Sequence, residues 1–244
     1  MAALGLGNGV IFQNDMGLSS QAFSLSFDGD NDQLTLGNVL NLGTADFSFS
    51  YWVNLPDVTS KNLITKFEDN DNAIYLMFAT DKIDTIIDGG GNLICNHPGE
   101  TDMTALQDTW IHICHTADRD GDTAIYVNGI ADGGSPNYGR PLHDMENDTQ
   151  NVDNTGSWQF MASGGSSRTE GFMTDVAFYN VALSATHVGE IYNGGTPFDL
   201  TTHSQNSALT GYWRFNEGSG STVADEIGSN DLTIVGATWS TNTP

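Results

Sequence analysis

The sequence predicts an all-β protein, built as a two-sheet antiparallel jelly-roll sandwich with one short helix. Short runs of alternating apolar and polar residues are separated by turns rich in Asn, Asp and Gly, and one segment carries the start and stop signals of a helix. The chain has 244 residues, and its 12 Phe, 7 Tyr and 5 Trp supply enough apolar side chain to fill the space between two sheets. Sandwiches of this length often form one domain.

Strands are predicted where apolar side chains recur with a period of two. Residues 23–27 and 47–53 each place Phe, Leu, Tyr or Val at every second position. Further β-rich runs cover residues 63–67, 73–78, 83–87, 110–116, 124–127, 173–179, 211–215 and 232–235. Because turn residues separate these runs at short intervals, the pattern favours a sandwich or jelly roll.

The predicted helix lies near residue 190. Ser184 can cap the segment ATHVGEIYN, and Leu183 and Val188 are spaced as a hydrophobic staple. Gly194 and Gly195 follow the segment and indicate its end.

Residues 131–157 form a long, polar stretch that is poor in strand formers. Loops of this length in compact domains are usually functional, so we expect a contact surface here. Within it, Tyr138, Arg140 and His143 place an aromatic ring beside polar donors, which suits a sugar ring. We therefore predict them as glycan-binding residues, with ordinary packing of the tyrosine as the alternative.

The charge of the chain excludes some partners. Seven basic and 31 acidic residues give a net charge of -24, which opposes the approach of nucleic acid or of an anionic membrane. Such a surface suits cations or a basic partner protein, although acidic groups can also simply keep a fold soluble. No run approaches the ~18 apolar residues that span a bilayer, so membrane insertion is not expected.

Cys95 and Cys114 are the two cysteines of the chain, too few for the disulfide framework of a small secreted module. Whether they pair is left open. The first residues lack a basic segment followed by a continuous apolar one, so export by the general secretion route is not expected.

Four sequence blocks occur in order: SLSFDGDNDQLTL, FSFSYWVN, TWIHICHTADRDGDTAIYVNGIADG and GFMTDVAFYNVALSATHVGEIYNGG. Together they resemble laminin-G-like domains of the concanavalin A-like lectin/glucanase type, from about Ala22 to Gly195. The resemblance implies a jelly-roll sandwich.

A fifth block, YWRFNEGSGSTVADEIGSNDLTIVGATW, resembles the segment that commonly opens such a domain, yet here it follows the helix. It is too short to form a core of its own, so we expect it to complete this sandwich or one in a neighbouring chain. The predicted organisation is an N-terminal arm at residues 1–21 and a single sandwich at 22–244, with 207–240 supplying closing strands.

One acidic turn is a predicted calcium site. Asp28, Asp30 and Asp32 alternate in the sequence, and calcium prefers such hard oxygen ligands. The spacing is not that of an EF-hand, because Gln33 stands where the loop needs glycine. The laminin-G-like resemblance implies calcium between the FDG block and the acidic strand before the helix, which adds Asp175. We therefore expect a structural Ca²⁺, with solvated turn acids as the alternative.

The remaining reactive residues give no catalytic pattern. Residues 118–122 read as a tight turn, since Asp-Gly between strands is a hairpin signal. His112 and His115 are three apart on a predicted strand and so point to opposite faces. Glucanases related by the resemblance use a Glu-x-Asp-x-x-Glu strand, but the nearest match, which begins at Glu146, has Asn151 in the last position. We therefore do not expect this protein to be an enzyme.

Together these observations favour a non-catalytic binding or assembly module. The laminin-G-like resemblance is compatible with a bacteriophage virion protein, such as a capsid decoration or adhesion protein, with capsid or tail proteins or its own copies as neighbours. A calcium-dependent carbohydrate-binding module is the alternative, and a glycoside hydrolase is less favoured. The expected location is the virion surface, or the extracellular space by a non-classical route.

Overall fold

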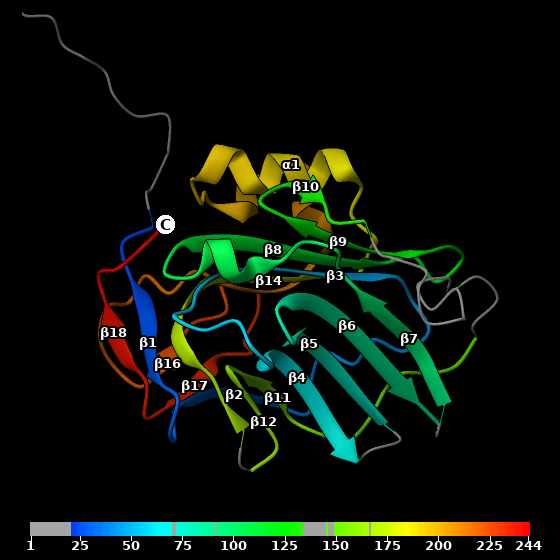
Figure 1. The fold of residues 1–244 in the computed structure, drawn as a ribbon, viewed down its shortest axis with the longest axis horizontal. Helices are drawn as coiled ribbons and strands as arrows, with labels where there is room; N and C mark the ends of the chain where they lie inside the picture. Colours follow the sequence, from blue (N-terminus) through cyan, green and yellow to red (C-terminus); the bar gives the residue numbers. More distant parts are fainter. Residues whose placement is uncertain (1–20, 70–71, 91, 134–144, 146–148, 166) are drawn as a thin grey trace, which may run out of the picture.

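Two eight-stranded antiparallel sheets pack face to face in the computed structural model of the protein (Figure 1), which confirms the predicted fold class. The structure describes residues 21–69, 72–90, 92–133, 145, 149–165 and 167–244. Tyr138, Arg140 and His143 lie outside the described residues, as do residues 1–20 of the predicted arm.

Both sheets mix strands from distant parts of the sequence. In spatial order, sheet A contains β10 (Ile130–Ala131), β9 (Thr123–Val127), β8 (Trp110–Ala117), β3 (Phe47–Asn54), β14 (Glu170–Tyr179), β1 (Ser24–Asp28) and β18 (Thr238–Ser240), and β15 (Leu209–Trp213) also pairs with β14. Sheet B contains β16 (Thr222–Val223), β17 (Leu232–Val235), β2 (Gln33–Gly37), β11 (Trp158–Phe160), β4 (Lys61–Asp69), β5 (Asn72–Ala79), β6 (Lys82–Gly89) and β7 (Asn92–Pro98). A small hairpin joins β12 (Ala162–Ser163) to β13 (Ser167–Arg168).

Each predicted run of alternating residues lies largely or wholly within a strand of the structure. The strands missing from those predictions are short or weakly patterned. β7 reads NLICNHP, without an apolar period of two, and β11 has only three residues. Their pairing partners in sheet B hold them, so tertiary contacts outweigh local propensity there.

Aromatic side chains fill the space between the sheets. The ring of Phe178 lies 4.6 Å from that of Phe49, 5.0 Å from that of Trp158 and 5.3 Å from that of Trp213, measured between centroids. These four side chains come from both sheets and are essentially buried. Edge-to-face packing of this kind adds to the free energy gained by burying apolar surface.

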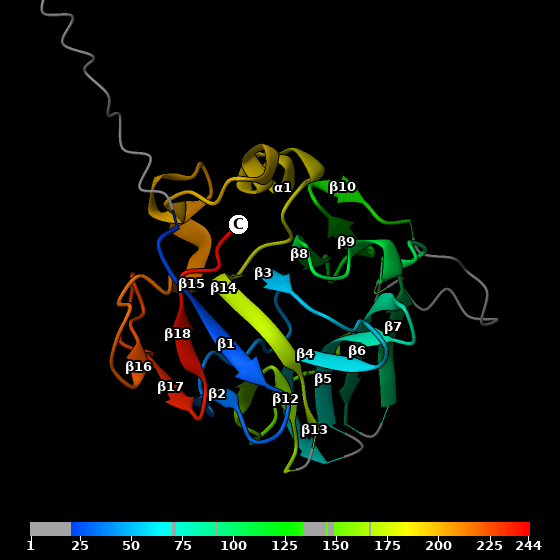
Figure 2. The ribbon, with the colours of Figure 1, turned by 60° about the vertical axis from the view of Figure 1, so that its left-hand side comes forward.

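Helix α1 (Ala185–Tyr192) lies over sheet A on the side away from sheet B, as both ribbon views show (Figures 1 and 2). The Ser184 hydroxyl accepts a hydrogen bond from the His187 N–H at 3.3 Å, which confirms the predicted cap. Asn193, and not a glycine, takes the left-handed position at the helix end, with φ 47°. Asparagine tolerates this conformation, and Gly194 follows with φ 63°.

The described part of the chain also contains four short 3-10 helices: Met103–Leu106, Asn193–Gly195, Leu200–Thr202 and Asn206–Ala208. Among the described residues, no helix combines the length and apolar character that crossing a membrane requires.

The C-terminal residues contribute strands to both sheets. β15 pairs with β14 and β18 with β1 in sheet A, whereas β17 pairs with β2 in sheet B. At the other end of the described chain, the Gln21 side-chain amide donates hydrogen bonds to the carbonyl oxygens of Phe23 and Arg214. Gln21, the last residue of the predicted arm, is therefore packed on the sandwich.

Candidate functional site on the outer face of sheet B

The predicted calcium ligands of the β1–β2 turn serve the backbone of that turn. Asp28 Oδ1 accepts hydrogen bonds from the N–H groups of Asp30 at 2.9 Å and Asn31 at 3.3 Å, and these bonds lower the pKa of Asp28. Asp32 Oδ2 accepts one from the N–H of Asp28 at 2.9 Å, and burial raises the pKa of Asp32. Such contacts stabilise a tight turn without a metal ion.

Asp175 does not join that turn. Strand pairing places Glu170 opposite Asp28, and Asp175 lies five residues further along β14, about 17 Å away at strand spacing. Among the described residues, no group of three or more His, Cys, Asp or Glu side chains is arranged to hold a metal ion. The strand register therefore separates Asp175 from the three carboxylates of the turn, and a calcium ion bound at Asp28, Asp30 and Asp32 stays a prediction.

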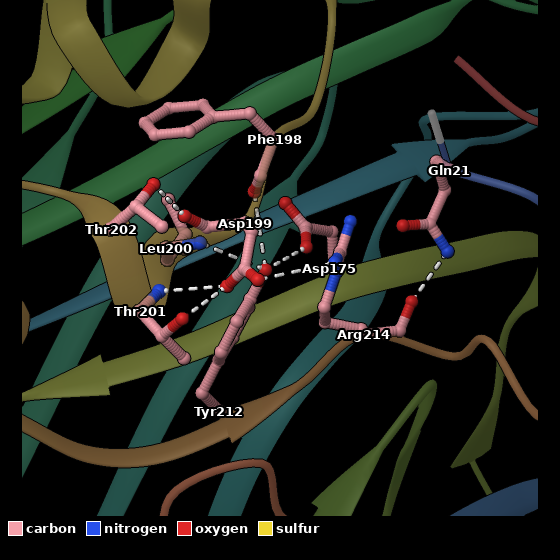
Figure 3. A network of polar contacts seen from close by, with 9 residues as sticks. All are labelled: Gln21, Asp175, Phe198, Asp199, Leu200, Thr201, Thr202, Tyr212 and Arg214. Atoms are coloured by element: carbon pink, nitrogen blue, oxygen red, sulfur yellow. Dashed lines mark hydrogen bonds and ion pairs between the residues drawn. The ribbon is translucent and has the colours of Figure 1, made fainter. Parts of the chain in front are cut away.

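Asp175 instead belongs to a polar network between β14, β15 and the segment at residues 198–202 (Figure 3). It sits at a bulge of β14 with φ 51°, and its Oδ1 accepts a hydrogen bond from the Tyr212 hydroxyl at 2.8 Å. That hydroxyl also accepts from the Leu200 N–H at 3.3 Å, and Arg214 lies 3.6 Å from Asp199. The network fastens the segment after α1 to β14 and β15.

Burial raises the pKa of Asp175 to about 7, because desolvation of the carboxylate outweighs the Tyr212 hydrogen bond and the nearby Arg214 charge. A carboxyl group held in this way stabilises the fold best when it is protonated.

His112 and His115 point to opposite faces of β8, which confirms the sequence prediction. His115 hydrogen-bonds Tyr51 and Thr85 at 2.7 Å each between the sheets, whereas His112 hydrogen-bonds Ser50 at 2.9 Å on the helix side. Burial lowers the pKa of both rings to about 3, so both are neutral. They are structural side chains.

The predicted turn at residues 118–122 is also confirmed. The Gly121 N–H donates to the Asp118 carbonyl oxygen at 3.2 Å, and β8 and β9 flank it. Cys95 and Cys114 are buried and unpaired with each other, and burial raises the pKa of both thiols, that of Cys95 to about 12. Neither is a reactive thiolate.

A different set of side chains forms a candidate binding surface on the outer face of sheet B. We call it the β4–β7 face, and it consists of Phe67, Tyr75, Met77, Asp84, Ile86, Asp88 and Asn96. The register aligns these residues across the strands: Tyr75 pairs with Ile86 and Ile86 with Asn96, while Met77 pairs with Asp84. The intervening residues Ile83 and Ile87 are fully buried between the sheets, so the face points away from the core.

Two aromatic rings form the apolar part of the β4–β7 face. The centroids of Phe67 and Tyr75 lie 6.2 Å apart at an interplanar angle of 47°. Burial, and then the charge of Asp88, raise the pKa of Tyr75, while a hydrogen bond with the Ser163 side chain lowers it. The Tyr75 hydroxyl thus lies between a carboxylate of β6 and the β12–β13 hairpin.

That hairpin borders the face on the β4 side. The Thr65 hydroxyl donates to the Ala162 carbonyl oxygen at 2.9 Å, and the Asn62 amide donates to the Ser167 hydroxyl at 2.8 Å. These two hydrogen bonds hold the hairpin against β4, so the hairpin forms the border of the face next to Tyr75.

Asp84 is the unusual group of the β4–β7 face. It is a diagonal neighbour of Tyr75, at about 7 Å between Cβ atoms, and only 5% of its surface is exposed. Its Oδ1 atom is buried and has no hydrogen-bond partner among the residues that the structure describes. Burial raises the pKa of Asp84 to about 6, and this effect outweighs a hydrogen bond with the Thr85 backbone, which lowers the pKa. An unpartnered buried acceptor is costly, and a donor from a ligand would satisfy it.

Asp84 and Asp88 lie on one strand and one face, four residues apart, so their carboxyl groups are separated by about 13 Å. Retaining glycosidases need about 5 to 5.5 Å between their two carboxyl groups, and inverting ones about 6.5 to 9.5 Å. The pair is therefore too widely spaced for either mechanism.

The sequence holds a signal for this face that the prediction missed. Residues 73–78 and 83–87 are predicted strands, and their alternation already assigns Tyr75 and Asp84 to the side opposite Ile74 and Ile83. What the sequence alone cannot give is that β5 and β6 are neighbours in this register, which brings the ring and the carboxylate together.

One cleft of about 170 Å³ lies at the end of the sandwich. It is lined mainly by apolar surface and by Leu40, Asn41, Leu42, Ala45, Asp46, Phe47, Tyr179, Asn180 and Thr210. Its polar groups already serve the fold: Asp46 accepts a hydrogen bond from the Arg119 N–H at 2.8 Å, and Asn41 accepts one from the Lys66 ammonium group.

Comparisons with known proteins agree with the fold. The family model described as the concanavalin A-like lectin/glucanases superfamily matches residues 28–189, most of the chain. No curated protein matches the sequence.

Solved structures with this fold include a Bacteroides ovatus protein described as a candidate carbohydrate binding protein, with a TM-score of 0.63 and 19% identity over 92% of this chain. The present chain spans 61% of the length of that protein. Domain 4 of an extracellular arabinanase from Geobacillus stearothermophilus, solved with arabinotriose, gives 0.51 and 16% identity, covering 69% of this chain and 76% of that domain. A heptameric pentraxin from Limulus polyphemus gives 0.53 and 14%, covering 88% and 94%. At these identities the similarity establishes the fold alone.

Proposed function

Because the chain belongs to the concanavalin A-like lectin/glucanases superfamily, we propose that it is a non-catalytic carbohydrate-binding module and that glycans bind on the β4–β7 face. The observation that carries the proposal is the buried, unpartnered Oδ1 of Asp84 beside Tyr75 and Phe67. A sugar presents apolar C–H faces to aromatic rings and hydroxyl donors to carboxylates, so one ligand can satisfy both features.

The absence of catalysis is part of the same proposal. The predicted strand motif ends in Asn151, and the Asp84–Asp88 separation of about 13 Å is too large for paired acid catalysis. The similarity to a carbohydrate binding protein and to a domain solved with arabinotriose supports a sugar ligand by analogy of fold.

A binding assay with a matched control tests the proposal. A panel of soluble polysaccharides is run by affinity electrophoresis and calorimetry against the wild type, Tyr75→Ala and Trp110→Ala. Trp110 is a half-exposed aromatic of sheet A, so its loss should leave binding unchanged, whereas Tyr75→Ala should weaken it about tenfold, since stacking and burial of one ring contribute about 1.4 kcal/mol or more. No reducing sugar should be released. Binding that is equally lost in both variants, or detectable hydrolysis, would contradict the proposal.

Our proposal for the biological setting is the one expected from the sequence: a virion surface, with capsid or tail proteins or further copies of the chain as neighbours, or else the extracellular space by a non-classical route. A glycan-binding face suits adhesion in either setting. Mass spectrometry of purified virions would detect the protein there, and its consistent absence would remove the virion part of the proposal.

A further inference from the structure

We infer that the β4–β7 face selects uncharged, hydroxyl-donating glycans and discriminates against acidic ones. The inference rests on the proposed function and specifies its ligand class. Three features of the face support it: an acceptor atom of Asp84 without a hydrogen-bond partner among the described residues, the charges of Asp84 and Asp88, and the half-buried apolar side chains beside them.

The face has an unused hydrogen-bond acceptor. Asp84 Oδ1 is buried without a partner among the described residues, and a carboxylate accepts hydrogen bonds but does not donate them. A ligand group that reaches it must therefore carry an O–H or N–H. A sugar hydroxyl supplies this donor, whereas a carboxylate or sulfate group placed at the same position does not.

Two of the three charged side chains on this side of β6 are negative. Asp84 and Asp88 point to the same face, and the charge of Asp88 reaches the Tyr75 hydroxyl strongly enough to raise the pKa of Tyr75. Lys82 lies two residues before Asp84 on the same side of β6, and its charge contributes to lowering the pKa of Asp102. An acidic glycan would meet the like charges of Asp84 and Asp88, and repulsion at a buried carboxylate is stronger than in bulk water.

The apolar surface accommodates a sugar ring without charge. Tyr75, Met77 and Ile86 are half-buried neighbours of Asp84 across and along the strands. Their side chains can pack against the C–H face of a pyranose or furanose beside Asp84. Apolar neighbours also keep the local dielectric constant low, which increases the electrostatic free energy of placing a second anion beside Asp84.

Competition between neutral and acidic polysaccharides tests the inference. Neutral arabinan and laminarin are compared with alginate and polygalacturonate, all at 0.15 M salt, against the wild type, Asp84→Asn and Asp28→Asn. Asp28 is an exposed aspartate on the β1–β2 turn and controls for the loss of one negative charge. Thermal melts confirm that each variant is folded.

The wild type should bind at least one neutral polysaccharide at least tenfold more tightly than either acidic one. Asp84→Asn keeps an acceptor oxygen but removes the negative charge, so it should narrow the gap between neutral and acidic polymers, while Asp28→Asn should change the binding of neither class. Acidic polymers that bind as tightly as neutral ones, with binding lost in Tyr75→Ala, would overturn the inference but leave the proposed function in place. A protein that binds none of the four and no other glycan would overturn both.

Discussion

At the scale of the residue, burial separates the roles of aspartates that look alike in the sequence. Asp28 is exposed and holds a turn, Asp175 is buried in a network with Tyr212, and Asp84 is buried with a free acceptor atom among the described residues. The sequence places the first two in one predicted calcium site because it shows acidic residues but not their solvent exposure. Only the strand register reveals which carboxylates share a neighbourhood.

The raised pKa of Asp175 predicts that folding stability depends on pH. Its pKa in the folded state, about 7, lies above the ordinary value of 3.8, so the folded state holds the proton more tightly than the unfolded state. The stabilisation is complete below about pH 4 and is lost as the pH rises to about 7, by up to about 4 kcal/mol.

Asp175→Asn keeps an acceptor for Tyr212 and should abolish this loss in urea unfolding between pH 4 and 8. Asp84→Asn is the matched control, since the pKa of Asp84, about 6, limits its own effect to a window between about pH 4 and 6. If the unfolding free energy of Asp175→Asn falls with pH as steeply as that of the wild type, the carboxyl group of Asp175 is not the cause.

A substitution in the β1–β2 turn tests whether its carboxylates bind calcium. Because Asp28 already accepts two backbone hydrogen bonds, Asp28→Ala should lower the melting temperature by the same amount with and without a chelator. A loss seen only in the presence of calcium would instead establish a metal site at Asp28, Asp30 and Asp32, as expected from the sequence.

At the scale of the element, the sequence predicts those strands whose alternation is long and regular and the one helix with both end signals. It does not predict β11, because three residues inside a polar stretch carry no period, and it does not reveal that β5 and β6 present Tyr75 and Asp84 side by side. Pairing between strands is a long-range property, and local pattern determines only which side chains share a face.

Helix α1 covers sheet A and should be independent of the β4–β7 face. Ser184→Ala removes the cap of the His187 N–H and should cost about 1 kcal/mol of stability in chemical unfolding. Ser184→Asp restores a capping acceptor and should recover most of that loss. Glycan affinity should not change in either variant, and a change would show that the two sheets are coupled.

At the scale of the whole molecule, both sheets need the C-terminal strands. Trp213 of β15 is fully buried against Phe178, and β17 and β18 pair with β2 and β1. A chain truncated after residue 206 would expose this surface and should aggregate or lose cooperative melting, because a large part of the core would face water. A soluble truncated protein that melts cooperatively would show that the C-terminal strands are dispensable.

The large negative charge acts on the whole molecule as well. A net charge of -24 disfavours anionic partners at long range, which agrees with the selectivity inferred for the β4–β7 face. Long-range repulsion is screened by salt, whereas the local charge of Asp84 is buried and is screened less. Discrimination against acidic glycans should therefore persist at high salt.

Mapping the bound glycan by nuclear magnetic resonance tests the central claim most directly. The neutral oligosaccharide that binds most tightly is titrated into labelled protein, and the backbone amide shifts are followed. We predict that the largest changes fall on β5 and β6, around Tyr75 and Asp84. Changes confined to residues 131–157, where the sequence predicts glycan binding by Tyr138, Arg140 and His143, or to sheet A, would contradict the assignment of the binding site to the β4–β7 face.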